Sequence, residues 1–128
     1  MAESRAVEVA RAHVAAWSTK DWDKARSMLA PDVHVIALTT NPAIPVTDLT
    51  GTDDYMQGLA AFAGPVVPGT VRELASIGDE RNALLTLDMH LAGGPFGAGA
   101  DAPCARHYLI SDDGKIQAEQ VVFYIGQQ

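Results

Sequence analysis

The chain has 128 residues, of which 48% are hydrophobic and 20% are charged, and its formal net charge is −7 at pH 7. This length fits one domain with one core, and the composition is typical of a globular protein rather than a disordered one. The negative charge repels nucleic-acid phosphates and anionic lipid headgroups, so we expect no nucleic-acid partner and no membrane partner. There is no signal-sequence core or membrane-length hydrophobic run, and the single cysteine, Cys104, excludes an internal disulfide. We therefore expect a cytoplasmic protein.

Two helices are predicted at the start of the chain. Apolar residues recur at helical spacing from Ala6 to Trp17 and predict an amphipathic helix over about residues 3–18. Asp21 suits the N-cap of a shorter second helix. We expect that helix to end at Ala30-Pro31, because proline lacks an amide donor and disfavours helix in the preceding residue.

A strand and a third helix follow. Val33–Leu38 predicts a strand, and the proline-bearing stretch Thr39–Thr50 predicts a loop without a central strand. A capped turn at Gly51–Asp54 leads into a helix whose apolar side includes Leu59, and Gly64-Pro65 ends it.

The second half of the chain is rich in predicted strands. They cover residues 70–77, 83–91, 104–110 and 115–125, with a long glycine-rich loop over residues 93–103. The order of helix, helix, strand, helix and four strands predicts an α+β protein. We expect three helices packed on one face of a strongly curved, mostly antiparallel sheet, so that the resulting cone encloses a pocket.

The last two strands form a predicted hairpin around Asp112-Asp113-Gly114. Polar side chains able to transfer protons interrupt these otherwise apolar strands: Arg106, His107, Tyr108 and Glu119. A charge inside an apolar strand costs several kcal/mol unless it is paired or hydrated. These residues therefore indicate a pocket or an ion pair.

The register of this hairpin decides which side chain faces Glu119. With a four-residue loop, Arg106 lies opposite Glu119 and Tyr108 is its diagonal neighbour. With a three-residue loop that ends in a glycine bulge, His107 lies opposite Glu119. A shift of one residue exchanges the two faces of a strand, and the first register leaves His107 outside the pocket.

The first helix carries two further candidates. His13 lies on its apolar side, either as a core residue or as an acid–base group, since an unperturbed histidine has a pKa of about 6.5. Trp17, one turn further on, is either a core residue or part of the pocket wall. The four histidines lack metal-ligand spacing and no nucleotide-binding glycine motif is present, so we expect no metal and no cofactor.

The chain resembles the nuclear transport factor 2 superfamily, and within it the SnoaL-like and ketosteroid-isomerase-like small proteins. The matching segments are residues 15–35, 51–56 and 113–124. The resemblance implies a cystatin-like cone over residues 1–128. It also implies a cofactor-independent isomerase, polyketide cyclase or epoxide hydrolase that acts on a hydrophobic polyketide-, terpenoid- or steroid-like molecule. The alternative is a non-catalytic ligand-binding or dimerisation domain of the same fold.

This chain differs from the isomerase pattern at the positions of the catalytic residues. The catalytic aspartate of that pattern falls on or near Ala37, its tyrosine near His13, and its protonated aspartate near Arg106 or His107. Glu119 is either a structural residue, on a dimer face or paired with an arginine, or a pocket carboxylate that acts as a general acid or base. If the protein is an enzyme, we predict that Glu119 transfers the proton. The predicted site is completed by the acid–base candidates Arg106, His107, Tyr108 and His13, and by the substrate-contacting residues Trp17, Leu59, Phe62, Val121 and Phe123.

A homodimer is expected from the outward positions of the strands. Helices cover one face of the predicted sheet, but Leu84, Leu109 and Val122 fall on the other. A second copy of the chain would cover these apolar side chains.

Overall fold

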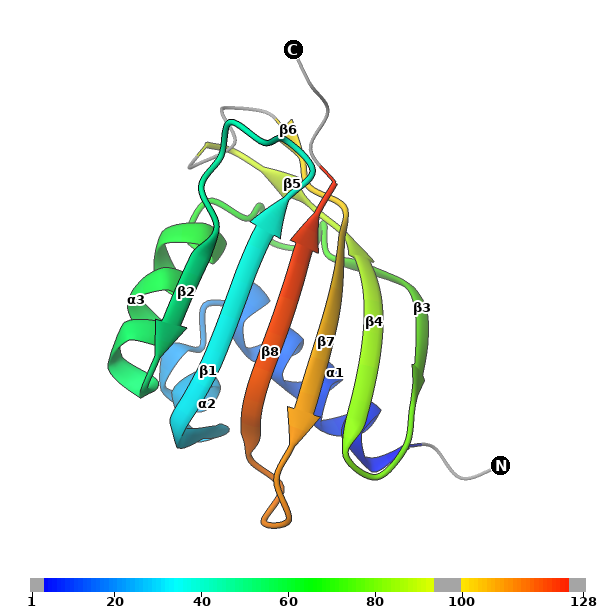
Figure 1. The fold of residues 1–128 in the computed structure, drawn as a ribbon. Helices are drawn as coiled ribbons and strands as arrows, with labels where there is room; N and C mark the ends of the chain where they lie inside the picture. The colour runs from blue at the N-terminus through cyan, green and yellow to red at the C-terminus, as the bar shows by residue number, and fades with distance from the viewer. Residues whose placement is uncertain (1–3, 94–99, 125–128) are drawn as a thin grey trace.

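The computed structural model describes residues 4–93 and 100–124. Within them, three helices and eight strands follow one another along the chain (Figure 1). The helices are α1 (Arg5–Ser18), α2 (Trp22–Ser27) and α3 (Thr52–Ala63). The strands are β1 (Leu29–Thr39), β2 (Thr47–Thr50), β3 (Arg72–Gly78), β4 (Asn82–Asp88), β5 (His90–Leu91), β6 (Ala100–Asp101), β7 (Cys104–Ile110) and β8 (Ile116–Phe123).

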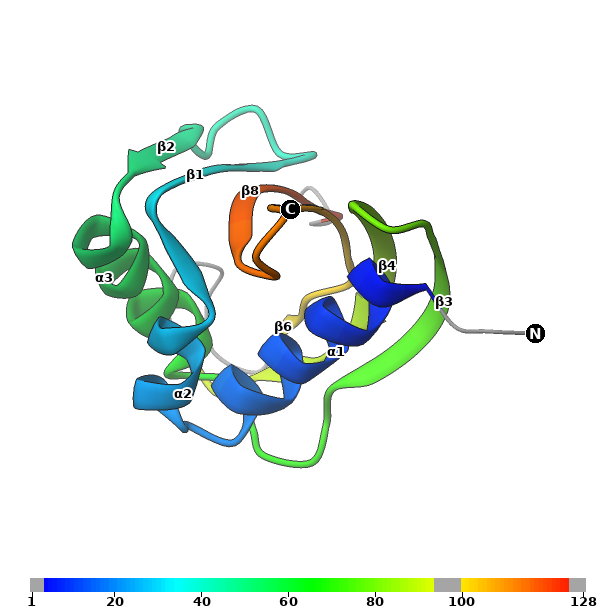
Figure 2. The same cartoon turned by 90° about the horizontal axis from the view of Figure 1, so that it is seen from below.

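Six of the strands form one curved sheet in the order β2-β1-β8-β7-β4-β3. β1 and β8 run parallel, and the other neighbouring strands are antiparallel. Figure 2 shows the sheet curving around the centre of the molecule, with α1 near β3 and β4 and α3 near β1 and β2. The prediction of an α+β protein with helices on a strongly curved, mostly antiparallel sheet is confirmed.

The first two helices begin where the sequence indicates, but the second ends early. The Ser4 side chain accepts a hydrogen bond from the Val7 amide at the start of α1, and Asp21 caps α2. α2 stops at Ser27 rather than at Ala30. The chain is already in β1 at Leu29, because this residue pairs with the beginning of β8.

Two loop predictions have different outcomes. The stretch Thr39–Thr50, predicted as a loop, contains the short edge strand β2, so the loop prediction was wrong for Thr47–Thr50. The expectation of no central strand there is confirmed, because β2 lies at the edge of the sheet. Most of the predicted glycine-rich loop, residues 94–99, and Ile125 at the end of the last predicted strand lie outside the described residues. None of the helices in the described part of the chain is long and apolar enough to cross a membrane.

The turn between β7 and β8 follows the shorter of the two predicted loops. The Ser111 amide donates to the Lys115 carbonyl oxygen at 2.8 Å, which leaves Asp112-Asp113-Gly114 as the loop. Gly114 has φ 82°, a left-handed conformation that glycine adopts without steric penalty. Ile110 then pairs with Ile116, as this loop requires.

A β-bulge next to this turn changes the register beyond it. Leu109 pairs with Ala118 although Ile110 pairs with Ile116, so Gln117 is an extra residue in β8. Tyr108 therefore lies opposite Glu119. Both predicted registers were wrong, because each assumed an uninterrupted ladder from the loop to Glu119.

The core lies between α1 and the concave face of the sheet. Its large, fully buried side chains come from α1, β4 and both strands of the hairpin, and include Trp17, Leu85, Leu87, Tyr108, Ile110 and Ile116. Burying one such side chain stabilises the fold by about 1.5–3 kcal/mol. Cys104 is also buried, as a small core residue.

Lys20, between α1 and α2, holds the end of α3. Its ammonium group donates to the carbonyl oxygen of Ala63, and to those of Gly64 at 3.0 Å and Val66 at 2.9 Å. The last turn of α3 contains no basic residue of its own. Lys20 therefore supplies the positive charge that favours a helix C-terminus, although it lies far away in the sequence.

Candidate functional site

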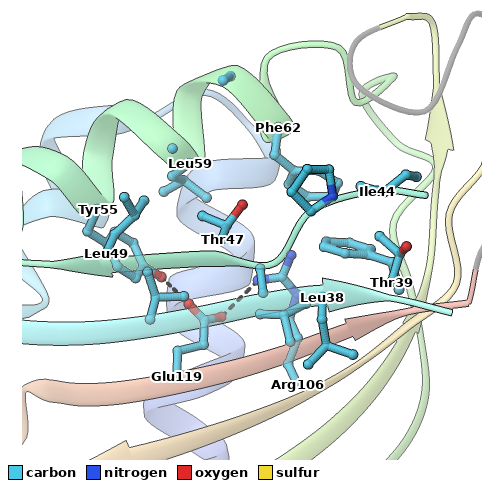
Figure 3. A pocket seen from close by; sticks show the side chains of 17 residues that line it. Leu38, Thr39, Ile44, Thr47, Leu49, Tyr55, Leu59, Phe62, Arg106 and Glu119 are labelled. Carbon is cyan, nitrogen blue, oxygen red and sulfur yellow. Dashed lines mark hydrogen bonds and ion pairs between the residues drawn. The ribbon is translucent and has the colours of Figure 1, made fainter. Parts of the chain in front are cut away.

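A pocket of about 270 Å³ lies between α3, the C-terminal half of β1, β2 and the concave face of the β7–β8 hairpin (Figure 3). Its lining is mostly apolar. The polar side chains among the residues that line it are Thr39, Thr47, Tyr55, Arg106 and Glu119.

The carboxylate of Glu119 is buried in the wall of this pocket and both of its oxygens are hydrogen-bonded. Oε2 accepts from Nη1 of Arg106 at 2.8 Å, and Oε1 accepts from the hydroxyl of Tyr55 (Figure 3). Glu119 and Arg106 are each only 2% exposed. Such charge-assisted hydrogen bonds are about twice as strong as neutral ones and fix the orientation of the carboxylate.

Sheet register and the third helix bring these groups together. Val35 of β1 and Tyr108 of β7 are the direct neighbours of Glu119 on its two sides. Arg106 precedes Tyr108 by two residues, so it points to the same face and reaches Glu119 diagonally. Tyr55 comes from the first turns of α3, whose side chains face β1.

Three aromatic rings surround the guanidinium group of Arg106. Its central carbon lies 4.9 Å from the ring centre of Trp17, 5.6 Å from that of Phe62 and 5.7 Å from that of Phe123. Burial works against this charge, but acidic groups around it, Glu119 among them, hold the pKa of Arg106 well above its ordinary value. Cation–π contacts also stabilise a buried guanidinium, so Arg106 stays charged.

One terminal nitrogen of Arg106 is left for a ligand. Nη1 binds Glu119, whereas Nη2 makes no hydrogen bond with the residues that the structure describes and points into the pocket (Figure 3). Nη2 is also not among the fully buried atoms that lack a partner, in contrast to Nε of the same side chain. The pocket wall therefore presents an accessible charged donor.

Two tyrosines beside Glu119 remain neutral. Burial, together with the negative charge of Glu119, raises the pKa of Tyr55 and of Tyr108 well above the ordinary value. Tyr55 donates to Glu119, while the buried Tyr108 hydroxyl makes no well-formed hydrogen bond with the described residues. Both phenols can act as proton donors but not as anions at neutral pH.

His13 lies behind this group and is uncharged at neutral pH. Its ring centre is 6.0 Å from that of Tyr55 and 6.1 Å from that of Tyr108. Burial lowers the pKa of His13 to about 4, since the favourable charge of Glu119 only partly offsets it and Arg106 adds to the shift. Neither ring nitrogen makes a well-formed hydrogen bond with the described residues.

The structure brings most of the predicted site residues together, at different depths. Four predicted substrate contacts line the pocket with Arg106 and Glu119: Leu59, Phe62, Val121 and Phe123. Trp17 is fully buried against Arg106 and does not line the pocket. Tyr108 and His13 are buried behind Glu119, so they contact its surroundings rather than the pocket.

His107 lies on the other face of the sheet. It pairs with Gln120, and its Nε2 is 3.0 Å from Oδ1 of Asn82. Successive side chains of a strand alternate between faces, so His107 points away when Arg106 and Tyr108 point inward. The prediction of a site role for His107 is therefore corrected: the structure places it outside the pocket.

Tyr55 is the site residue that the sequence did not single out. It belongs to the apolar side of the third helix, one turn before Leu59, which suits a core aromatic equally well. Ala37, where the isomerase aspartate was expected to fall, does line the pocket and provides no acid. In the described part of the chain, no group of three or more His, Cys, Asp or Glu side chains is arranged to hold a metal ion.

Comparisons with known proteins agree with this architecture. Residues 10–119 match the SnoaL-like domain family. A crystal structure from Kribbella flavida has 27% identity and a TM-score of 0.74, over 91% of this chain and 84% of that one. The comparison with curated proteins found no match.

Two more distant structures show the same fold. A Silicibacter pomeroyi protein with a cystatin-like fold is 17% identical, with a TM-score of 0.70 over 90% of this chain and 72% of that one. A Mycobacterium tuberculosis protein in complex with estradiol-17β-hemisuccinate is 12% identical, with a TM-score of 0.74 over 93% of both chains. The predicted cystatin-like fold is confirmed.

The buried ion pair predicts a specific pattern of stability. Arg106→Met leaves Glu119 as a buried charge without its partner, so the free energy of unfolding should fall by about 3–5 kcal/mol. Adding Glu119→Gln to this variant removes the unpaired charge and should restore a large part of the loss. Urea denaturation measures both changes, and equal stabilities of the single and double variants would contradict the prediction. Arg72→Met, at an exposed ion pair on β3, is the control and should change stability by less than about 1 kcal/mol.

The lowered pKa of His13 predicts that stability falls in acid. Unfolded His13, with a pKa near 6.5, binds a proton at a pH where the folded protein does not, so acid favours unfolding. Above pH 6.5 His13 is neutral in both states and does not affect the free energy of unfolding. This free energy should decrease by about 3 kcal/mol as the pH falls from 6.5 to 4. His13→Leu should remove this part of the pH dependence in urea denaturation at a series of pH values. A variant whose unfolding free energy falls as steeply as that of the wild type would exclude His13 as its source.

Proposed function

Since this chain belongs to the SnoaL-like domain family, whose ketosteroid-isomerase-like fold suggests isomerase-type chemistry on small molecules, we propose that it is a cofactor-independent acid–base enzyme. Its substrate is a hydrophobic small molecule that binds in the pocket below α3. Isomerisation, cyclisation and epoxide opening all fit this proposal, because each requires a positioned proton acceptor or donor.

The observation that supports this proposal is the orientation of Glu119. Its carboxylate is nearly excluded from water, lies in the wall of a mostly apolar pocket, and is fixed at both oxygens. A carboxylate held in this position can act as a proton acceptor for a molecule bound in the pocket. Each oxygen retains a second lone pair for this purpose.

A proton transfer in this pocket keeps its total charge constant. Glu119 takes a proton from a carbon next to a carbonyl group, and the electrons of the broken C–H bond form an enolate. The negative charge thereby moves from Glu119 to the substrate oxygen, where Nη2 of Arg106 can stabilise it. Return of the proton to another carbon of the conjugated system completes an isomerisation and regenerates the carboxylate.

A non-catalytic binding domain is the second candidate. It is favoured by the fact that Glu119 already has a partner at each oxygen, as in a structural ion pair. In this case the pocket binds a ligand without proton transfer.

Hydrogen exchange distinguishes the two candidates. We expect the protein to accelerate exchange of α-protons into deuterium oxide for at least one member of a panel of cyclic ketones, as followed by NMR. Glu119→Gln removes the base but leaves the charge of Arg106 without its partner, so circular dichroism must verify the fold of this variant. In the folded variant the acceleration should fall by about 10²- to 10⁴-fold while ligand binding remains. Exchange that is unchanged in this variant, or absent throughout the panel in the wild type, would favour the binding domain.

We also propose that two copies of the chain associate through the outer face of the sheet. The helices cover only the concave face (Figure 2). On the outer face, Leu84 is 41% and Ile77 is 70% exposed, and these two residues pair with each other across β3 and β4. The predicted contacts Leu109 and Val122 are partly exposed on the same face. A stable dimer buries about 800 Å² on each partner, which a sheet face of this kind can provide.

Light scattering at micromolar concentration tests this association. We expect the mass of a dimer for the wild type and of a monomer for Leu84→Lys, because a charge at the centre of the apolar face opposes its burial. Asp113→Lys, in the exposed turn between β7 and β8, is the control and should leave the dimer intact. A monomeric wild type would refute the proposal.

A further inference from the structure

The arrangement of charges in the pocket limits which ligands it accepts. Arg106 and Glu119 form an ion pair whose net charge is zero. The neighbouring groups add no charge, since His13, Tyr55 and Tyr108 are neutral at pH 7. A ligand therefore enters an apolar site that is already electrically balanced.

A ligand with a charge of either sign would disturb this balance. A carboxylate would place a second negative charge close to Glu119 in surroundings of low dielectric constant, where repulsion between charges is strong. An ammonium group would place a second positive charge close to Arg106, where the same repulsion acts. Neither charge has a free counter-ion among the described residues that line the pocket.

The strongest group offered to a ligand is a donor. Nη2 of Arg106 points into the pocket without a hydrogen-bond partner among the described residues, and the three rings around the guanidinium fix its plane (Figure 3). A ligand that supplies an acceptor forms a charge-assisted hydrogen bond with this donor, whereas an apolar ligand would cover the donor without giving it a partner.

The volume of the pocket limits the size of the ligand. The pocket has a volume of about 270 Å³. Sites for drug-sized molecules usually have volumes of about 300–1,000 Å³. One or two rings fill a pocket of this size.

We infer that the pocket selects a compact, uncharged molecule of one or two rings whose single carbonyl oxygen accepts a hydrogen bond from Nη2 of Arg106. This inference rests on the proposed ligand pocket but not on proton transfer. Arg106 is thereby the specificity-determining residue, and it discriminates against carboxylates in spite of its positive charge.

Three probes of the same shape test the inference. Acetophenone carries a neutral acceptor, α-methylstyrene replaces its oxygen by a methylene group, and benzoate replaces its methyl group by a charged oxygen. Dissociation constants at pH 7 are obtained from the NMR shifts of the Val121 and Phe123 amides, which lie in the pocket wall. Acetophenone should bind at least about tenfold more tightly than each of the other two, as expected for one hydrogen bond to a charged donor.

A paired variant assigns the preference to Arg106. Arg106→Gln with Glu119→Gln removes both charges together, so that no unpaired charge is buried, and circular dichroism verifies its fold. In this variant, acetophenone and α-methylstyrene should bind within about threefold of each other. Arg72→Gln, on the exposed edge strand, is the control and should keep the wild-type preference.

Several outcomes would overturn the inference. They are equal binding of acetophenone and α-methylstyrene, benzoate binding as tightly as acetophenone, a preference that survives in the paired variant, or no saturable shift with any probe. These results concern recognition only. A failure of proton transfer is detected separately, because hydrogen exchange in the wild-type protein is measured independently of the dissociation constants of the probes.

Discussion

The ion pair between Arg106 and Glu119 imposes the main constraint on this structure. Removing each charge from water costs several kcal/mol, and the mutual attraction offsets that cost only when further partners are in place. Tyr55 supplies one such partner from α3, and Trp17 supplies another from α1. The two helices and the hairpin must therefore occupy defined positions before the charges can be buried. The pocket lies next to this ion pair, between α3 and the sheet (Figure 3).

The pocket combines opposite physical properties in a small volume. Its walls are mostly apolar, and electrostatic interactions are stronger in apolar surroundings than in water. Its polar end holds a carboxylate and a charged donor that belong to the same ion pair. In the proposed reaction, the proton acceptor and the group that stabilises the oxyanion are thus coupled by geometry, and neither can be altered without affecting the other. The enzyme and the non-catalytic binding domain are both candidates because Glu119 is buried with a partner at each oxygen, which suits a reactive carboxylate as well as a structural ion pair.

The sequence predicted the elements well and the pairing of side chains poorly. Period-two alternation in the hairpin places Val121 and Phe123 on the pocket side, and glycines mark both ends of α3 and the turn between β7 and β8. The bulge at Gln117 has no such signal, because glutamine is ordinary in a strand, so the partner of Glu119 could not be assigned. Tyr55 was missed for a related reason: helical spacing identifies an apolar side but does not determine whether one hydroxyl meets a carboxylate from a distant strand.

Lys20 links the position of the end of α3, which forms part of the pocket wall, to the chemical modification of one side chain. One ammonium group joins the segment after α1 to three carbonyl oxygens at the end of α3. That end of α3 carries Phe62, which contacts Arg106 from the side opposite the sheet. Acylation of Lys20 would neutralise the charge and leave only one amide donor for these acceptors. The dimensions of the ligand space are thus linked to the covalent state of a lysine that does not line it.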